Sequence, residues 1–195
     1  MENQIVIEEK PEWISWGDIK QCLKEAHAEN RSKGINMAHY QWPEEKIKES
    51  IGDRGVVLVA LEGCKLVGTA ALAVKTNKMW YAAEDYAYVC FDAVIPQYSG
   101  KGVFKSMDLR REELALKLGL NTLVFDTHEN NIHRQQIALK NGYHYVKYFR
   151  AATKDHYNVV MAKWLGRSPY SRLYCFVKFE VSKIKTLLIT KVLHR

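Results

Sequence analysis

The chain has 195 residues, of which 47% are hydrophobic, 26% are charged and 11% are aromatic. This length predicts one domain with a substantial core and excludes two large domains, and the composition excludes a disordered chain. The formal net charge is +7, and residues 166–195 contribute seven basic residues against the single acid Glu180. The preceding segment keeps 22 of the 29 basic and 21 of the 22 acidic residues, so only the C-terminal segment offers a basic surface to a partner.

Capping residues and hydrophobic periodicity divide the chain into short segments. Ser15 is a plausible N-cap for the first helical pattern, which stops before Gly34. We predict helices over residues 13–32, 43–51, 103–118 and 131–141. Strands are predicted over residues 4–8, 55–61, 65–75, 86–95, 121–127, 143–150 and 156–164.

The order of these elements is typical of an α+β fold. A Glu62-Gly63 turn joins two apolar strands into an antiparallel hairpin. The strand, helix and strand between residues 86 and 127 form a unit that should be parallel and right-handed. The sequence therefore predicts a mixed, mostly antiparallel sheet with a central parallel strand pair and flanking helices.

The expected environment follows from the cysteines and the first residues. Positions 22, 64, 90 and 175 show no CxxC spacing, which argues against a disulfide framework or a zinc site. The first twelve residues are polar and acidic, so we expect no secretory signal. These features predict a cytoplasmic protein without a metal ion.

The segment Pro96-Gln97-Tyr98-Ser99-Gly100-Lys101-Gly102 joins the predicted strand 86–95 to the next helix. Its glycines let the backbone approach a ligand closely, and its N–H groups lie at the positive end of a helix. Lys101 adds a positive charge. A pyrophosphate is the natural ligand of such a loop, although glycine-rich turns before helices also occur without a ligand.

This loop resembles the signature of the GNAT acetyltransferase family, Gln/Arg-x-x-Gly-x-Gly/Ala between a strand and a helix. Gln97, Gly100 and Gly102 match it in the required place. The run from Asn130-Asn131 to Gly142-Tyr143 is similar to a later helix of the family, which starts at an Asn and ends in Gly-aromatic. The resemblance covers residues 4–165. We interpret residues 1–165 as an acetyltransferase domain, followed by a basic amphipathic helix over residues 166–195.

The resemblance implies an enzyme that moves an acetyl group from acetyl-CoA to an amine by direct attack of the amine on the thioester. The cofactor would lie where the fourth and fifth strands splay apart. Backbone groups of the fourth strand would bond the pantetheine arm, loop amides would hold the pyrophosphate, and Asn131 would contact the cofactor near its thiol. The implied cofactor-binding residues are Ala93, Val94, Ile95, Gln97, Ser99, Gly100, Lys101, Gly102, Val103 and Asn131.

The general acid is the point at which the chain departs from the family. Many members carry a Tyr seven residues after the Asn, and this position is Ala138 here. Tyr98, Tyr143 and Tyr145 are near in sequence, and we take Tyr145 as the candidate. The alternative function is a module of the same fold that binds acyl-CoA with little turnover.

Two acids interrupt apolar strands and are candidates for the general base. Asp92 and Asp126 lie among residues expected to be buried, where a carboxylate needs a partner or a function. His128 follows Asp126 and titrates in the useful pH range. We predict Asp92 as the base with His128 as a further candidate, against the alternative that each acid bonds local backbone or a basic neighbour.

The acceptor is an unidentified small-molecule or peptide amine. The aromatic residues Trp80, Tyr81, Tyr86 and Tyr88 either line its site or belong to the core. In this family the acceptor site also includes the first two helices and the segment between them. Here that segment covers residues 30–42, with His39, Tyr40 and Trp42.

The C-terminal segment carries an apolar stripe with helical spacing. Lys178, Lys183 and Lys185 lie off this stripe, whereas Lys191 falls within it and the apolar Phe179 and Ile189 fall outside. The charges of the segment exclude a transmembrane span. Three alternatives remain open: packing on its own domain or on a second subunit as a homodimer through residues 173–195, peripheral contact with an anionic membrane, and nucleic-acid binding, which we do not expect. The stripe consists of Leu173, Val177, Val181, Ile184, Leu188 and Val192.

Overall fold

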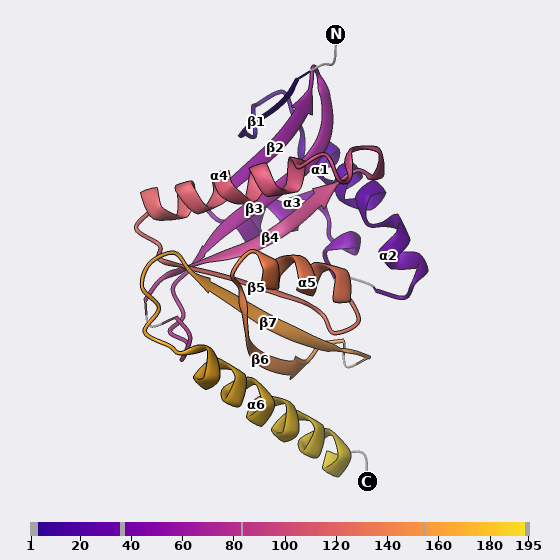
Figure 1. The fold of residues 1–195 in the computed structure, drawn as a ribbon. Helices are drawn as coiled ribbons and strands as arrows, with labels where there is room; N and C mark the ends of the chain where they lie inside the picture. Colours follow the sequence, from indigo (N-terminus) through magenta and orange to yellow (C-terminus); the bar gives the residue numbers. More distant parts are fainter. Residues whose placement is uncertain (1–3, 36–37, 83, 154, 194–195) are drawn as a thin grey trace.

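The computed structural model describes residues 4–35, 38–82, 84–153 and 155–193. A seven-stranded sheet runs through the molecule in the order β1-β2-β3-β4-β5-β7-β6 (Figure 1). Neighbouring strands are antiparallel except for β4 and β5, which are parallel. The strands are β1 (Ile5–Glu9), β2 (Val56–Glu62), β3 (Lys65–Lys75), β4 (Tyr86–Val94), β5 (Thr122–His128), β6 (His144–Arg150) and β7 (Tyr157–Trp164).

The helices begin and end close to the predicted signals. Ser15 caps α1 through a capping box with Asp18, because each residue's side chain bonds the other's main chain. The single helix predicted over residues 13–32 is interrupted at His27, which ends α1 and precedes α2. The helices are α1 (Trp16–Ala26), α2 (Ala28–Ser32), η1 (Ala38–Gln41), α3 (Glu44–Ile51), η2 (Pro96–Tyr98), α4 (Val103–Lys117), α5 (Ile132–Lys140) and α6 (Arg172–Leu193).

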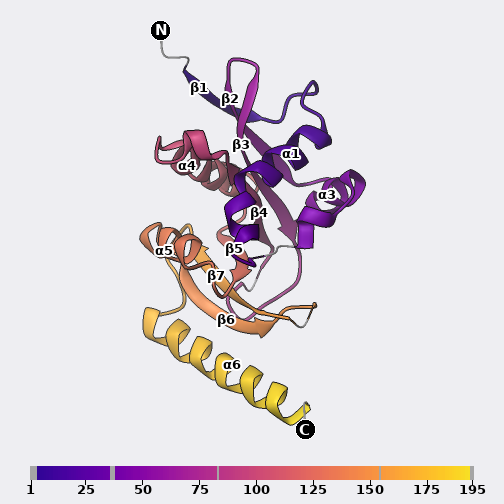
Figure 2. The same cartoon turned by 90° about the vertical axis from the view of Figure 1, so that its right-hand side faces the viewer.

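Helices cover both faces of the sheet. The helices α4 and α5 lie on one face, and α1 and α3 lie on the other (Figure 2). Strands β2 and β3 are buried on both faces between these layers, so their sequences are apolar without alternation. The last helix, α6, lies along β6 at the far edge of the sheet (Figure 1).

The predicted fold class is confirmed, since the sheet is mixed and its central parallel pair is β4–β5. One feature of the topology was not predicted. Strand β7 lies between β5 and β6. The β6–β7 hairpin therefore joins the sheet through β7, and β6 is the edge strand.

The parallel pairing of β4 with β5 is short, so the sheet opens between these two strands. Only Ala87 with Leu123 and Tyr88 with Val124 are paired, and the two strands separate beyond them. Strand β4 also contains a β-bulge, because Phe91 and Asp92 together face the single residue Ala70 of β3. Phe91 has a φ of 54°, an uncommon value for a residue other than glycine.

Gly68 on β3 lets α4 approach the sheet. A Cβ at this position would lie 3.0 Å from the Ala93 carbonyl oxygen and 3.1 Å from the Met107 methyl group. We predict that Gly68→Val lowers the free energy of unfolding by about 1–3 kcal/mol, because the branched side chain overpacks the β3–α4 contact. Urea denaturation measures the change. Gly166→Val is the control, since no atom lies within 4 Å of its Cβ position, and equal stability of the two variants would contradict the prediction.

Candidate active site

The loop before α4 offers unpaired main-chain donors. The Ser99 and Lys101 amides donate within the turn to the Pro96 and Tyr98 carbonyls, at 3.0 Å and 3.4 Å. In the described structure the N–H groups of Gly100, Gly102, Val103 and Phe104 donate to no protein acceptor. Gly100 and Gly102 have φ values of 78° and 80°, which glycine adopts without strain. Four unpaired amides at the start of a helix form a site for an anion.

Two lysines add positive charge beside these amides. The Nζ atoms of Lys101 and Lys65 lie 4.9 Å and 5.4 Å from the centre of the Tyr98 ring. Tyr98 is itself buried and its hydroxyl donates to Glu62 on β2. Gln97, in η2, is exposed beside the loop. The loop therefore combines unpaired amides with two lysine ammonium groups, a combination that suits a phosphate group.

The edge of β4 that faces β5 is open beyond Tyr88. There Ala93, Val94 and Ile95 pair with β3 on one side only. The His27 ring, from the end of α1, bonds the Asp92 carbonyl oxygen at 2.8 Å, and burial lowers the pKa of His27. The loop before α4, residues 96–102, is called the amide loop below. The open edge of β4 leads directly from the amide loop into the gap between β4 and β5.

An ionic network braces this gap on the face covered by α4 and α5. Asp92 of β4 accepts hydrogen bonds from Arg111 of α4 and from Arg134 of α5, the latter at 2.8 Å. Arg111 is 1% exposed and also bonds Asp108 at 2.6 Å. The Arg134 guanidinium lies 4.1 Å from the centre of the Phe125 ring on β5. Both Asp92 oxygens are therefore occupied by cations, which favours the predicted alternative of a basic neighbour over a free base.

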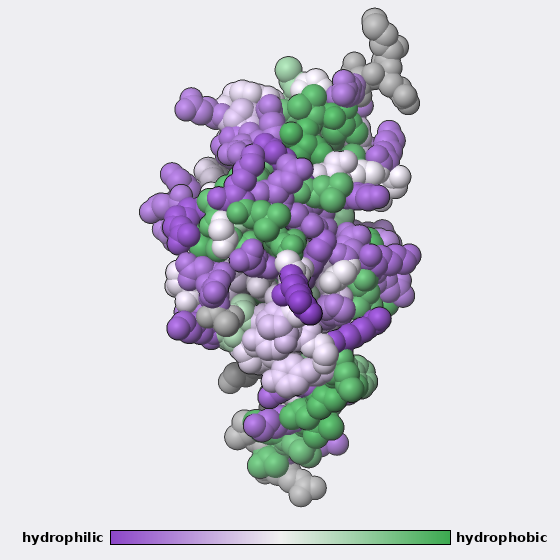
Figure 3. Space-filling model, turned by 60° about the vertical axis from the view of Figure 1, so that its left-hand side comes forward, coloured by the Kyte–Doolittle hydropathy of each residue, from purple (hydrophilic) through white to green (hydrophobic). Residues whose placement is uncertain are grey.

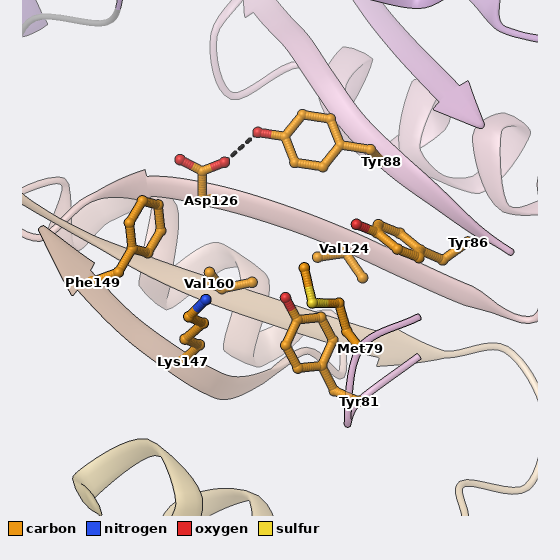
Figure 4. Close-up of a pocket in the computed structure, with 9 residues that line it drawn as sticks. All are labelled: Met79, Tyr81, Tyr86, Tyr88, Val124, Asp126, Lys147, Phe149 and Val160. Atoms are coloured by element: carbon orange, nitrogen blue, oxygen red, sulfur yellow. Dashed lines mark hydrogen bonds between the residues drawn. The ribbon is translucent and has the colours of Figure 1, made fainter. Parts of the chain in front are cut away.

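A pocket of about 160 Å³ opens on the opposite face of the same strands (Figure 4). Leu123 and Phe125 of β5 point into the core under α4 and α5, so Val124 and Asp126 point away from it. The pocket is lined mainly by apolar and aromatic side chains with one acid and one lysine. Its residues are Met79, Tyr81, Tyr86, Tyr88, Val124, Asp126, Lys147, Phe149 and Val160.

Asp126 is the buried acid of this pocket. Its carboxylate accepts a hydrogen bond from the Tyr88 hydroxyl across the gap (Figure 4). It accepts another from the Asn158 side chain at 2.8 Å. Burial raises the pKa of Asp126, and these two donors oppose the rise. Burial and the neighbouring carboxylate raise the pKa of Tyr88, which keeps its hydroxyl protonated. A carboxyl with a raised pKa in a pocket fits proton transfer.

His128, Tyr145 and Asn131 gather at the start of α5 rather than in the pocket. The His128 Nδ1 atom accepts from the Asn130 amide at 3.0 Å, and its ring stacks on His156. The Tyr145 hydroxyl donates to Gln135, whose amide bonds the His128 carbonyl. Asn131 caps α5, and its side-chain amide donates to Thr127 at 3.1 Å. Each of these predicted site residues has a local hydrogen-bonding role.

The predicted aromatic residues separate into two groups. Tyr81, Tyr86 and Tyr88 line the pocket, whereas Trp80 packs against Tyr170 and Tyr174. At the far side of β4, His39 and Trp42 contact the Phe91 ring, with centroids 5.4 Å and 6.4 Å away. The Tyr40 side chain lies outside the described residues.

The remaining tyrosine candidates and Ala138 belong to the interior. Ala138 is fully buried, and Tyr143 is 1% exposed behind α4. Burial raises the pKa of Tyr143, and the hydroxyl has no hydrogen-bond partner among the described residues. The Ala138 position thus supplies no proton donor to the gap.

Sequence reasoning missed Lys65, Arg111 and Arg134. Arg111 sits on a helical face with Met107 and Leu114, so its position in the apolar stripe was a usable signal of burial. Lys65 and Arg134 carry no such signal, because tertiary contacts alone bring them to the loop and to Asp92.

Solved structures of acetyltransferases share this fold. The ribosomal-protein-S18-alanine N-acetyltransferase from Escherichia coli matches with a TM-score of 0.63 and 14% identity, over 86% of this chain and 98% of that chain. A GNAT acetyltransferase from Elizabethkingia anophelis with acetyl-CoA bound gives 0.61 and 13%, over 85% and 100%. The PaiA N-acetyltransferase from Thermoplasma acidophilum in complex with coenzyme A gives 0.60 and 19%, over 83% and 99%.

Comparison with curated protein sequences gave no match. Residues 16–143, however, match the acetyltransferase (GNAT) family. The matched segment includes the amide loop, the open edge of β4, the gap between β4 and β5, and the helix α5 that follows. With the fold and these features together, the chain belongs to the GNAT acetyltransferase family.

Proposed function

We propose that the protein transfers the acetyl group of acetyl-CoA to a primary amine held in the pocket beside Asp126. The observation that carries this proposal is the gap between β4 and β5, which separates an anion-binding loop from a pocket with a buried acid. Acetyl-CoA would enter the gap from the side of the loop. Its thioester would then lie within reach of an amine that enters from the side of the pocket. Positioning of the two reactants would supply most of the rate.

Acetyl-CoA binding rests on the loop and on β4. The unpaired amides of Gly100, Gly102 and Val103 would hold the diphosphate, with the ammonium groups of Lys101 and Lys65 as counter-charges. The open edge from Ala93 to Ile95 would bond the amides of the pantetheine arm. In this arrangement Asp92 is a positioning residue, since it ties β4 to α4 and α5 beside the gap.

Asp126 is the base that the pocket supports best. An ammonium group would lose one proton to its carboxylate, and the amine nitrogen would then attack the thioester carbonyl carbon. The C–N bond forms, the C–S bond breaks, coenzyme A leaves as a thiolate, and the acylated nitrogen loses its second proton to water. The base role predicted for Asp92 has less support, because both its oxygens are ion-paired with arginines, whereas those of Asp126 accept from the neutral Tyr88 hydroxyl and Asn158 amide. The role predicted for His128 has less support because its Nδ1 atom accepts from the Asn130 amide and its ring does not line the pocket.

Water is the proposed proton source for the departing thiolate. Ala138 is fully buried and offers no hydroxyl, and the Tyr145 hydroxyl already donates to Gln135 at 2.9 Å. Burial raises the pKa of Tyr145, which weakens it as an acid. Ala138 is also the one observation that favours an acyl-CoA-binding module with little turnover, and the assays below separate the two functions.

The pocket also limits the acceptor. A volume of about 160 Å³ suits an amine on a small or side-chain-sized group, and the lining tyrosines can contact an ammonium through their ring faces. The Lys147 ammonium on the pocket wall disfavours acceptors with several closely spaced positive charges. Monoamines should therefore be acetylated faster than polyamines.

The cofactor site is tested by Lys101→Glu. We predict that calorimetric affinity for CoA falls at least tenfold, because a negative charge replaces a positive one beside the diphosphate. Affinity for acetyl-pantetheine, which has no phosphate, should not change. Lys117→Glu, at the far end of α4, is the matched control. No measurable CoA binding by the wild-type protein would end the acetyltransferase proposal, and CoA binding without CoA release over an amine panel would favour the binding module.

The base is tested by Asp126→Asn with the exposed Asp53→Asn as control. Asp126 must be ionised to accept a proton, so wild-type kcat/KM should fall as pH decreases through its pKa, which lies above the ordinary value of 3.8. The variant should lose about 10²–10⁴-fold in kcat and lose this pH limb.

Stability provides the independent check on Asp126. Because its folded-state pKa is raised, ionisation opposes folding, so the wild-type protein should lose stability as pH rises through that pKa. Asp126→Asn should lack this loss and stay folded. A variant that keeps the wild-type rate and pH profile would remove Asp126 as the base.

The positioning role of Asp92 is tested by Asp92→Asn. Breaking the pair with the buried Arg111 should lower the free energy of unfolding by about 3–5 kcal/mol. Activity measured at a temperature where the variant is folded should keep the acidic limb of the pH profile. Glu113→Gln, which breaks the exposed Arg110–Glu113 pair, should not change stability measurably. Unchanged stability together with loss of the pH limb would instead identify Asp92 as the base.

A further inference from the structure

Helix α6 turns a partly polar face toward the sheet. Cys175 and Phe179 are buried against the domain, and Ser182 and Thr186 follow them on the same face. The Ser182 hydroxyl accepts from the Tyr148 amide at 2.9 Å, and the Thr186 hydroxyl donates to the Tyr148 carbonyl at 3.2 Å. These bonds to β6 fix the orientation of the helix, so its opposite face is set as well.

The opposite face of α6 is the apolar stripe, and it points to solvent. Its side chains are between 49% and 72% exposed, although all are large aliphatic groups. Figure 3 shows a hydrophobic surface that covers much of α6 on one side. We call this surface the outer stripe; it consists of Leu173, Val177, Val181, Ile184, Leu188 and Val192.

The outer stripe follows almost the whole length of α6. A helix of 22 residues is about 33 Å long, and the stripe follows it from Leu173 to Val192. The largest apolar patch on an ordinary monomer covers about 300–600 Å² and is often functional. No helix in the described part of the chain has the length and apolar character needed to cross a bilayer. We therefore expect α6 to bind along a surface rather than to cross a bilayer.

Positive charges border the outer stripe. By helical spacing Lys178 and Lys185 lie beside the stripe, Arg172 precedes it, and Lys191 falls within it; all four are exposed, and Glu180 is the only acid between residues 172 and 193. Long lysine side chains can leave the apolar face and place their charges in the headgroup layer. Lys178, for example, reaches back over the Tyr174 ring at 5.4 Å. Such a border matches an anionic surface.

Aromatic side chains stand at the first turn of α6. Trp80, Tyr170 and Tyr174 contact one another, with ring centroids 5.6 Å to 5.9 Å apart. Tyr174 is 41% exposed at the end of the outer stripe. Trp and Tyr are enriched where a protein meets the membrane–water interface, because their rings are apolar and their polar atoms bind water.

We propose that α6 is an interfacial helix that lies on an anionic lipid bilayer with the outer stripe among the acyl chains. Apolar burial and attraction of its basic border to the headgroups would act together. A second copy of the chain is a poorer occupant of this face. Two outer stripes in contact would bring the basic borders of both helices together, with only Glu180 on each to offset them.

Vesicle flotation of the full chain tests the proposal. We expect the wild-type protein to float with phosphatidylcholine vesicles that contain 30% phosphatidylserine, and to bind vesicles of phosphatidylcholine alone at least tenfold more weakly. The double variant Val181→Asp/Ile184→Asp should reduce the bound fraction at least tenfold, because it places charges in the outer stripe. Lys178→Glu/Lys185→Glu should abolish the preference for the anionic vesicles.

Leu109→Asp is the matched control, since Leu109 is a 53% exposed aliphatic residue on α4 and should not affect binding. Circular dichroism and CoA binding check that each variant is folded. The proposal is overturned if the wild-type protein does not float with anionic vesicles, or if Val181→Asp/Ile184→Asp floats as well as the wild type. Light scattering that shows a dimer in solution, reduced to a monomer by the same double variant, would assign the face to a second copy instead.

Discussion

The pairing of β4 with β5 ends after two residue pairs, although both strands continue beyond it. Separated strand edges leave main-chain groups without partners, and such an opening persists only when other contacts hold it. On one face, the opening is held by the ion pairs of Asp92 with Arg111 and Arg134. On the other face, the Tyr88–Asp126 hydrogen bond spans it. Burying these charges is costly, so the opening is maintained against the tendency of a sheet to close.

The two ends of the molecule use polar groups in different ways. Around the gap, polar and charged groups are buried and keep a cavity open. On α6, the hydroxyls of Ser182 and Thr186 attach the helix to the main chain of β6 and leave its aliphatic groups outside. The Trp80–Tyr81 segment joins these regions, because Trp80 packs on the start of α6 while Tyr81 lines the pocket.

Local signals made most elements predictable from the sequence. The Ser15 cap, the glycines after α3, α4 and α5, and the short apolar runs of the strands depend on neighbouring residues only. The contacts of Asp92 were not predictable, because its partners lie 19 and 42 residues away. Periodicity revealed the stripe on α6 but not its direction, because the opposite face is held to the domain by buried Cys175 and Phe179 and by the hydroxyls of Ser182 and Thr186. The raised pKa of Asp126 likewise depends on burial that no local pattern encodes.

The bulge at Phe91 and Asp92 shifts the alternation of side chains along β4 by one residue. Even-numbered side chains therefore lie on one face of the sheet before the bulge and on the other face after it. Before it, Tyr88 faces the pocket; after it, Asp92 reaches the arginines on the other face while Phe91 contacts His39 and Trp42. Loss of one residue here would restore regular alternation and exchange the faces of everything that follows. In any alignment of this chain with its relatives, the placement of a single gap near residue 91 therefore decides which side of the sheet each aligned residue serves.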